Sequence, residues 1–292
     1  MLEINKIYNE DCIKTMRRID DSSIDLIIAD PPYYKIKNED WDKQWENKDS
    51  FLEWIEMLCQ EWKRILKNNG SIYIFASHKL SSHVEVTVSK YFNILNNIRW
   101  RKKNGWHNKT KKNPHKLHSF LSDWESIIFA EQLNNQYFLR EARIKANISS
   151  NEAGLLFPSK TGKPTGCVRN WELGLNRPDR EQYEKLKTLY SLPNYDEAFR
   201  KFNVEEDFCF DIWDDINSIH SSVQRHPCEK PVELINRILN ISSNKDDLVY
   251  IPFAGSGSEI VSCIKNQRNW IASEINEQYI NEVIIPRIYN IK

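Results

Sequence analysis

The tetrapeptide Asp30-Pro31-Pro32-Tyr33 combines side chains that could do chemistry, and it directly follows an apolar run at residues 24–29. Two consecutive prolines have a fixed φ angle and no backbone N–H, so they form a rigid, extended turn. The turn would therefore present a carboxylate, a carbonyl and an aromatic ring together at the end of a strand. A simple strand terminator followed by a loop is the other interpretation of these residues.

The second group of candidate residues is a glycine-rich turn at residues 253–258, which contains two of the eight glycines in the chain, Gly255 and Gly257. Such a turn at the carboxyl end of a parallel strand lets the backbone approach a ligand closely. It is not a G-x-G-x-x-G pattern, which disfavours a nicotinamide oxidoreductase. Glu274 lies seventeen residues after Gly257, a spacing at which an acidic side chain meets a ribose diol. A tight turn followed by a surface glutamate would give the same pattern.

Strand-like and helix-like segments alternate around both groups and must position them. Continuous apolar runs separated by amphipathic stretches are typical of a parallel sheet covered on both faces. The alternation stops in the middle of the chain, so we expect an α/β core made from residues 1–135 and 223–292, with residues 136–222 inserted. The patterns predict strands at 24–29, 71–77, 94–100, 124–130, 247–252 and 269–276, and helices at 49–67, 79–91, 230–242 and 258–266.

Together these motifs resemble the β-class of S-adenosylmethionine-dependent DNA amino-methyltransferases, in which D-P-P-Y precedes F-x-G-x-G. The resemblance covers roughly residues 4–135 and 223–287 and includes shorter matches at 8–12, 226–231 and 273–276. It implies a Rossmann-like, doubly wound, mostly parallel sheet with a permuted motif order. Residues 1–135 would be the catalytic half, 223–292 the cofactor-binding half, and 136–222 a mainly helical target-recognition region.

The resemblance also implies roles for individual residues, with S-adenosylmethionine as the cofactor and no metal. The chain departs from the family at Ile251, where an aspartate is usual. Three alternatives follow: Glu259 supplies the missing carboxylate, another acid supplies it, or the contact is dispensable. The implied catalytic residues are Asp30, Pro31, Pro32 and Tyr33. The implied cofactor-binding residues are Asp11, Cys12, Asp30, Lys230, Phe253, Ala254, Gly255, Ser256, Gly257, Ser258 and Glu274.

The implied reaction needs help from the protein, because the lone pair of an exocyclic amino group on a nucleobase is delocalised into the ring. The Asp30 carboxylate and the Pro31 carbonyl could accept its two N–H bonds and aim the lone pair at a methyl donor. The base would have to flip out of the duplex, with Tyr33 stacking on it and Tyr34 assisting or packing. An aspartate at the first position favours adenine N6. Cytosine N4, a structured RNA substrate and a non-catalytic DNA-binding regulator are the alternatives.

Local basic segments must hold the DNA, because 41 basic and 41 acidic residues cancel over the whole chain. Residues 99–118 carry eight Lys or Arg and no acid, which is typical of a phosphate-binding segment or of a solvated basic loop. Residues 165–174 look like the second half of a helix-turn-helix, although a plain helical insertion is nearly as good an interpretation. The DNA-binding candidates are Arg101, Lys102, Lys103, Lys109, Lys111 and Lys112 in the first segment, and Arg169 and Asn170 in the second.

Several other classes of protein are disfavoured. No apolar run approaches the roughly 20 residues that span a bilayer, and the N-terminus lacks a signal-peptide pattern. The six cysteines contain no C-x-x-C pair, so neither a zinc site nor a disulfide framework is indicated. We therefore expect a cytoplasmic protein whose partner is double-stranded DNA. The resemblance leaves open a homodimer and a companion restriction endonuclease.

Overall fold

The computed structural model divides the chain into two units, residues 1–131 with 201–292 and residues 132–200. The second unit ends at Arg200, before the end of the expected insertion at 222. The reason is a short strand, β6 (Ile212–Trp213), which pairs with β4 (Phe92–Arg101) and returns residues 201–219 to the first unit. The structure describes residues 2–34, 43–102, 115, 117–132, 138–205, 209–219, 225–226 and 228–291.

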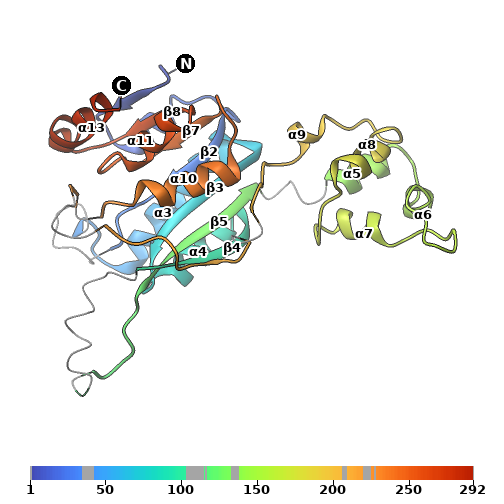
Figure 1. Ribbon diagram of the computed structural model, residues 1–292, viewed down its shortest axis with the longest axis horizontal. Coiled ribbons are helices and arrows are strands. Elements are labelled where there is room, and N and C mark those ends of the chain that lie inside the picture. Colours follow the sequence, from blue (N-terminus) through green and yellow to red (C-terminus); the bar gives the residue numbers. More distant parts are fainter. Residues whose placement is uncertain are drawn as a thin grey trace. The chain divides into compact units, whose positions relative to one another are not determined.

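An eight-stranded sheet organises the described part of the first unit, in the order β1-β8-β7-β2-β3-β5-β4-β6 (Figure 1). The pairs from β1 to β3 are parallel, whereas β5 runs antiparallel to β3. This mostly parallel α/β sheet confirms the predicted fold class. The remaining strands are β1 (Lys6–Tyr8), β2 (Ile24–Ala29), β3 (Leu66–Ser77), β5 (Trp124–Gln132), β7 (Leu248–Ile251) and β8 (Asn269–Ser273).

Two hydrophobic cores lie on opposite faces of the sheet, and alternate residues of β2 feed them. Leu26 and Ile28 belong to one core, whereas Ile27 and Ala29 belong to the other. This division explains the continuous apolar run, because side chains alternate between the two faces of a strand. Helices α10 (Val232–Ser242) and α11 (Ser258–Lys265) cover the first face, and α1 (Cys12–Met16), α3 (Lys48–Ile65) and α4 (Ser81–Ser89) cover the second.

Helix α3 illustrates why the sequence folds this way locally. Its buried residues include Ile55, Leu58 and Trp62, which recur at helical spacing, and Asn47 caps its first turn by accepting a hydrogen bond from the Ser50 N–H. The helix ends at Ile65 and β3 begins with the next residue. The sequence pattern placed the end of this helix near residue 67, because the Asn-Asn-Gly sequence there is typical of a helix stop.

The C-terminal segment continues as α12 (Glu277–Tyr279), a π-helical turn η6 (Ile280–Ile284) and α13 (Ile285–Tyr289). The second unit has its own core, which includes Trp171, Tyr183 and Leu186, and five helices in its described part. These are α5 (Phe138–Lys145), α6 (Ser150–Gly154), α7 (Cys167–Glu172), α8 (Arg180–Lys187) and α9 (Tyr195–Ala198). None of the helices that the structure describes is both long and apolar enough to cross a membrane.

Candidate functional site

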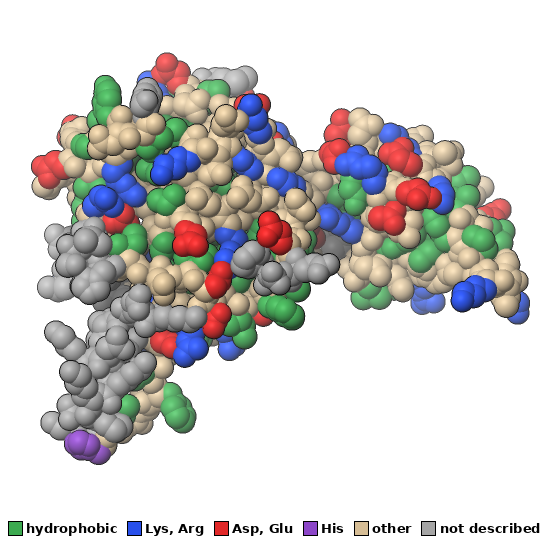
Figure 2. All heavy atoms as spheres, in the orientation of Figure 1, with side chains coloured by type: hydrophobic (Ala, Val, Ile, Leu, Met, Phe, Trp, Pro, Cys, Tyr) green, Lys and Arg blue, Asp and Glu red, His purple; other side chains and the backbone are tan. Residues whose placement is uncertain are grey.

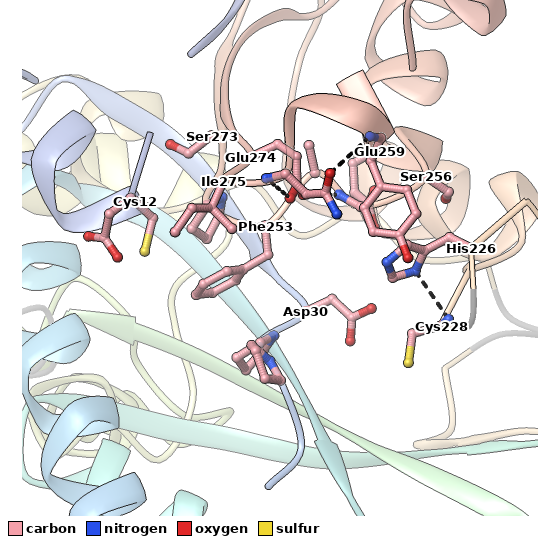
Figure 3. A pocket seen from close by; sticks show the side chains of 18 of the residues that line it. Cys12, Asp30, His226, Cys228, Phe253, Ser256, Glu259, Ser273, Glu274 and Ile275 are labelled. Atoms are coloured by element: carbon pink, nitrogen blue, oxygen red, sulfur yellow. Dashed lines mark hydrogen bonds between the residues drawn. The ribbon is translucent and has the colours of Figure 1, made fainter. Parts of the chain in front are cut away.

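The two predicted motifs emerge side by side at the carboxyl ends of β2 and β7. These strands are parallel neighbours, with Leu26 opposite Val249 and Ile27 opposite Tyr250. After β2 the chain crosses to β3 on one side, and after β7 it crosses to β8 on the other side. Such a reversal is where open α/β sheets bind ligands. A cavity of about 340 Å³ lies here, and its walls include Asp30 and Phe253 (Figure 3).

The glycine-rich turn forms one wall of this cavity. Gly255 and Gly257 have φ angles of +48° and +75°, which glycine adopts without the strain of a side chain. A Cβ on Gly257 would lie 3.2 Å from the Ile284 side chain, and Gly257 is also the N-cap of α11. The turn therefore needs glycine both for its conformation and for its close packing.

Glu274 connects this turn to the end of β8. Its Oε2 accepts a hydrogen bond from the Gly255 N–H at 2.8 Å, and its Oε1 accepts one from the Asn276 N–H at 2.8 Å (Figure 3). Burial raises the pKa of Glu274, while these two N–H groups lower it. Each carboxylate oxygen keeps a second lone pair, so the side chain can still accept hydrogen bonds from a diol.

Asp11 and Cys12 also line the cavity, at the start of α1. The Asp11 carboxylate caps this helix by accepting a hydrogen bond from the Ile13 N–H at 2.8 Å. The Cys12 carbonyl accepts one from the Tyr250 hydroxyl at 3.1 Å. The structure therefore brings both residues to the cavity that Gly255 also lines.

The segment before α10 packs onto the glycine-rich turn. The His226 ring accepts a hydrogen bond from the Cys228 N–H at 3.1 Å and lies next to the Tyr279 ring, with centroids 4.6 Å apart (Figure 3). A Cβ on Gly255 would lie 3.5 Å from the His226 ring. The Ser258 hydroxyl donates to the Lys230 carbonyl at 2.7 Å. These contacts join His226 and Lys230 to the turn.

Lys230 contacts Asp30 directly, although the resemblance grouped it with the cofactor residues. Its side chain is 3% exposed, and Nζ lies 2.6 Å from Asp30 Oδ2, 3.1 Å from the Tyr33 hydroxyl and 3.6 Å from Glu125 Oε2. The Tyr33 hydroxyl donates to Asp30 Oδ1 at 2.7 Å. Burial raises the pKa of Asp30, and the Lys230 ammonium opposes that effect. Lys230 still lines the same cavity.

The two tyrosines after Pro32 differ in their surroundings. Tyr33 is buried, and the Lys230 ammonium lies 5.3 Å from the centroid of its ring. Tyr34 has a φ angle of +61° and stacks on Phe51 with ring centroids 5.8 Å apart. Of the two roles considered for Tyr34, the structure therefore places it in packing.

Two further acids, Glu259 and Glu125, complete the site. Glu259, in the first turn of α11, is 4% exposed and lines the cavity, and burial raises its pKa to about 7. Ile251 is fully buried in the core instead. Sequence reasoning named Glu259 but missed Glu125, which opens β5 beside Lys230. An acid at the start of an otherwise apolar strand was the signal that could have found it.

The predicted DNA-binding residues lie in both units. Arg101 pairs with Asp123 at 2.8 Å, and Lys102 donates to Glu125, so neither charge stands alone. Arg169 and Asn170 are exposed on α7. Figure 2 shows both signs of charge interspersed over the visible face of the second unit. Lys103, Lys109, Lys111 and Lys112 lie outside the described residues.

Sequence comparisons relate this chain to known proteins. A family model described as DNA methylase matches residues 24–285. The DNA adenine methyltransferase YhdJ of Escherichia coli is 26% identical over 280 residues, which cover 95% of this chain and 81% of that protein.

Solved structures share the fold. The crystal structure of an M1.HpyAVI–SAM complex superposes with a TM-score of 0.58 at 18% identity, covering 97% of this chain and 98% of that one. The cytosine-N4-specific PvuII DNA methyltransferase superposes with a TM-score of 0.61 at 12% identity, covering 100% and 92%. At these identities the likeness extends to the fold alone.

Proposed function

The chain belongs to the N6/N4 family of S-adenosylmethionine-dependent DNA amino-methyltransferases, and from this premise we propose that it methylates N6 of a flipped-out adenine in duplex DNA. The observation that carries the proposal is the shared cavity. Asp30, Pro31 and Tyr33 line it together with Glu274 and the glycine-rich turn. A methyl acceptor and a methyl donor could therefore meet in one place.

The cavity walls fit S-adenosylmethionine, which when bound supplies an electrophilic methyl group on a sulfonium centre. Glu274 presents a carboxylate suited to a ribose diol, and Asp11 presents one suited to an adenine amino group. Glu259 presents a buried carboxyl, and within the described residues no Lys or Arg forms a salt bridge with it. A cationic methionine moiety would give that carboxyl a counter-ion. Lys230 and the remaining turn residues position these groups.

Asp30 and Pro31 would bind the amino group that is methylated. The Asp30 carboxylate has one lone pair on each oxygen engaged by Lys230 and Tyr33, and it keeps others for a substrate N–H. The Pro31 carbonyl would accept the second N–H. Holding both bonds orients the nitrogen lone pair, so that catalysis consists of positioning and electrostatics. A base inside a duplex cannot reach this cavity, which is why we propose base flipping.

The choice of adenine over cytosine rests on Asp30 at the first position of the motif. The test is to incubate the purified protein with S-adenosylmethionine and duplex DNA, digest the product, and identify the methylated nucleoside by mass spectrometry. We expect N6-methyladenine, and N4-methylcytosine in its place would contradict the adenine proposal. Long-read sequencing of DNA from a host that expresses the protein would give the methylated site.

An Asp30→Ala variant tests the catalytic role of Asp30 in the same assay. We expect it to bind S-adenosylmethionine but to lose methyl transfer, because it removes the acceptor for the amino group. A rate within about tenfold of wild type, corresponding to only about 1.4 kcal/mol, would show that Asp30 is not catalytic.

We further propose that the second unit recognises the target sequence. It is a separate helical unit with its own core, and it exposes Arg169 and Asn170, side chains that can form paired hydrogen bonds with base edges. Residues 99–118 would contribute phosphate contacts. The proposed enzyme would therefore divide catalysis and recognition between its two units.

A further inference from the structure

We propose that Glu125 is a positioning residue that acts on Asp30 through Lys230: by sharing the Lys230 ammonium, it keeps Asp30 a strong hydrogen-bond acceptor for the reacting amino group. This inference rests on the methyl transfer proposed above. It concerns a residue that neither sequence motif contains.

The sheet topology brings Glu125 to the site. Glu125 begins β5, and because β5 runs antiparallel to β3, its first residues lie at the carboxyl end of β3, with Glu125 opposite Ser77. The neighbouring strand on the other side of β3 is β2, which ends just before Asp30. The antiparallel direction of one strand therefore adds an acid to an edge that is otherwise formed by the ends of parallel strands.

Four charges of alternating sign form a row from the cavity towards the surface. Asp30 pairs with Lys230 at 2.6 Å, Lys230 faces Glu125 at 3.6 Å, and Glu125 accepts a hydrogen bond from Lys102. Lys230 is almost fully buried, whereas the Lys102 side chain is 31% exposed. A buried ammonium between two carboxylates divides its attraction between them.

The contact between Glu125 and Lys230 is electrostatic and not a hydrogen bond. Glu125 Oε2 is buried, and it makes no hydrogen bond within the described part of the chain. Burying such an oxygen without a hydrogen-bond partner opposes folding. The Glu125 charge attracts the Lys230 ammonium and repels the Asp30 carboxylate. Both effects make Asp30 a better hydrogen-bond acceptor than it would be if Lys230 paired with Asp30 alone.

The charged groups around Asp30 and Glu125 determine the pKa values of these two carboxyls. Asp30 faces Lys230, the Tyr33 hydroxyl, Glu125 and Glu259, while Glu125 faces Lys230 and Lys102, and Cys228 lies near Lys230. Glu125 raises the pKa of Asp30, and Lys230 lowers it. The two lysines hold the pKa of Glu125 at about 2, so Glu125 stays ionised at every working pH.

The experiment measures kcat against pH at saturating S-adenosylmethionine and DNA. Glu125→Gln keeps the shape of the side chain and removes its charge. The pKa of Asp30 should then fall, so the acid limb of the profile should move to lower pH by about one unit, and the plateau should drop because Asp30 is a weaker acceptor. Glu131→Gln, at the other end of β5, is the matched control and should leave the limb in place.

Lys102→Met is the second variant, and it removes the partly exposed charge at the outer end of the same row. It frees Glu125 to act more strongly on Lys230, so the acid limb should move to higher pH, opposite to Glu125→Gln. Because Glu259 also faces Asp30, the profiles are repeated with Glu259→Gln, where the Glu125→Gln shift should persist.

The outcomes are distinguishable. Opposite shifts in the two variants support the inference. An acid limb that stays in place in Glu125→Gln, or a lower plateau without a shift, would show that Glu125 is only structural. No methylated product from the wild-type protein would instead contradict the proposed function itself.

Discussion

Residue 251 is isoleucine where the resemblance led us to expect an aspartate, and Glu259 supplies a carboxyl from a different element. Ile251 packs in the core, whereas Glu259 lines the cavity from the first turn of α11. Burial raises the pKa of Glu259 to about 7, and the charge of Asp30 adds to this effect. An anion near the N-terminus of a helix is favourable, so this carboxyl can ionise when a cation binds.

We therefore predict that the affinity for S-adenosylmethionine depends on pH through Glu259. A bound cation lowers the pKa of this carboxyl from its value of about 7 in the free protein, so binding is strong above pH 7 and weakens as the pH falls below it. Glu259 should make the dissociation constant about tenfold larger at pH 6 than at pH 8. Calorimetry at both pH values should show this tenfold change in the dissociation constant in the wild type but not in Glu259→Gln.

The amino group of S-adenosylmethionine also titrates, but it affects the wild type and Glu259→Gln equally. Comparing the two proteins at the same pH therefore isolates the effect of Glu259. An equal pH dependence in both proteins would mean that Glu259 does not face the cation.

The glycine-rich turn and the segment that follows β8 are held together, because Glu274 accepts a hydrogen bond from a backbone N–H in each of them. The carboxylate therefore has two tasks, holding the turn in shape and presenting acceptors to the cavity. The backbone of Gly255, at a positive φ angle, needs this fixed acceptor to keep its N–H satisfied.

We predict that Glu274→Ala raises the dissociation constant for S-adenosylmethionine by tenfold or more, since a hydrogen bond to a charged group contributes about 1.5–3 kcal/mol. Glu277→Ala removes an exposed acid from the adjacent α12 and is the matched control. Calorimetry should find unchanged affinity in the control. An affinity for the Glu274 variant equal to wild type would refute the ribose assignment.

At the scale of the whole molecule, the two units would make different kinds of contact with DNA. Residues 99–118 include eight Lys or Arg and no acid within the segment itself, which favours contact with phosphates. The second unit exposes both signs of charge together with Arg169 and Asn170, which suits the reading of bases.

We predict that salt titrations of DNA binding separate the two roles. Lys111→Ala and Lys112→Ala should weaken binding to cognate and scrambled duplexes alike, each reducing the slope of log affinity against log salt by about one. Arg169→Ala or Asn170→Ala should cost about 1–3 kcal/mol on the cognate duplex and little on the scrambled one. Arg180→Ala, which removes an exposed arginine paired with Asp196, is the control in the same unit. Equal losses on both duplexes for Arg169→Ala would assign sequence reading to another segment.

The sequence by itself determined the central elements of the fold and two walls of the site. Strand β2 and helix α3 follow from periodicities that depend only on neighbouring residues, and these are decided locally. The meeting of Asp30 with the glycine-rich turn was also predictable. Both follow buried strands of a parallel sheet, and the carboxyl ends of such strands share an edge.

Only the tertiary structure decided which residues Lys230 contacts and that Glu125 lies beside it at the site. The ion pair of Lys230 with Asp30 joins residues 200 positions apart, and the contact with Glu125 depends on β5 running antiparallel to β3. The end of the second unit at Arg200 likewise depends on β6 pairing with β4. Strand order and direction are set by how the whole chain buries its apolar faces. No local pattern encodes them, and side-chain contacts between distant segments follow only once they are fixed.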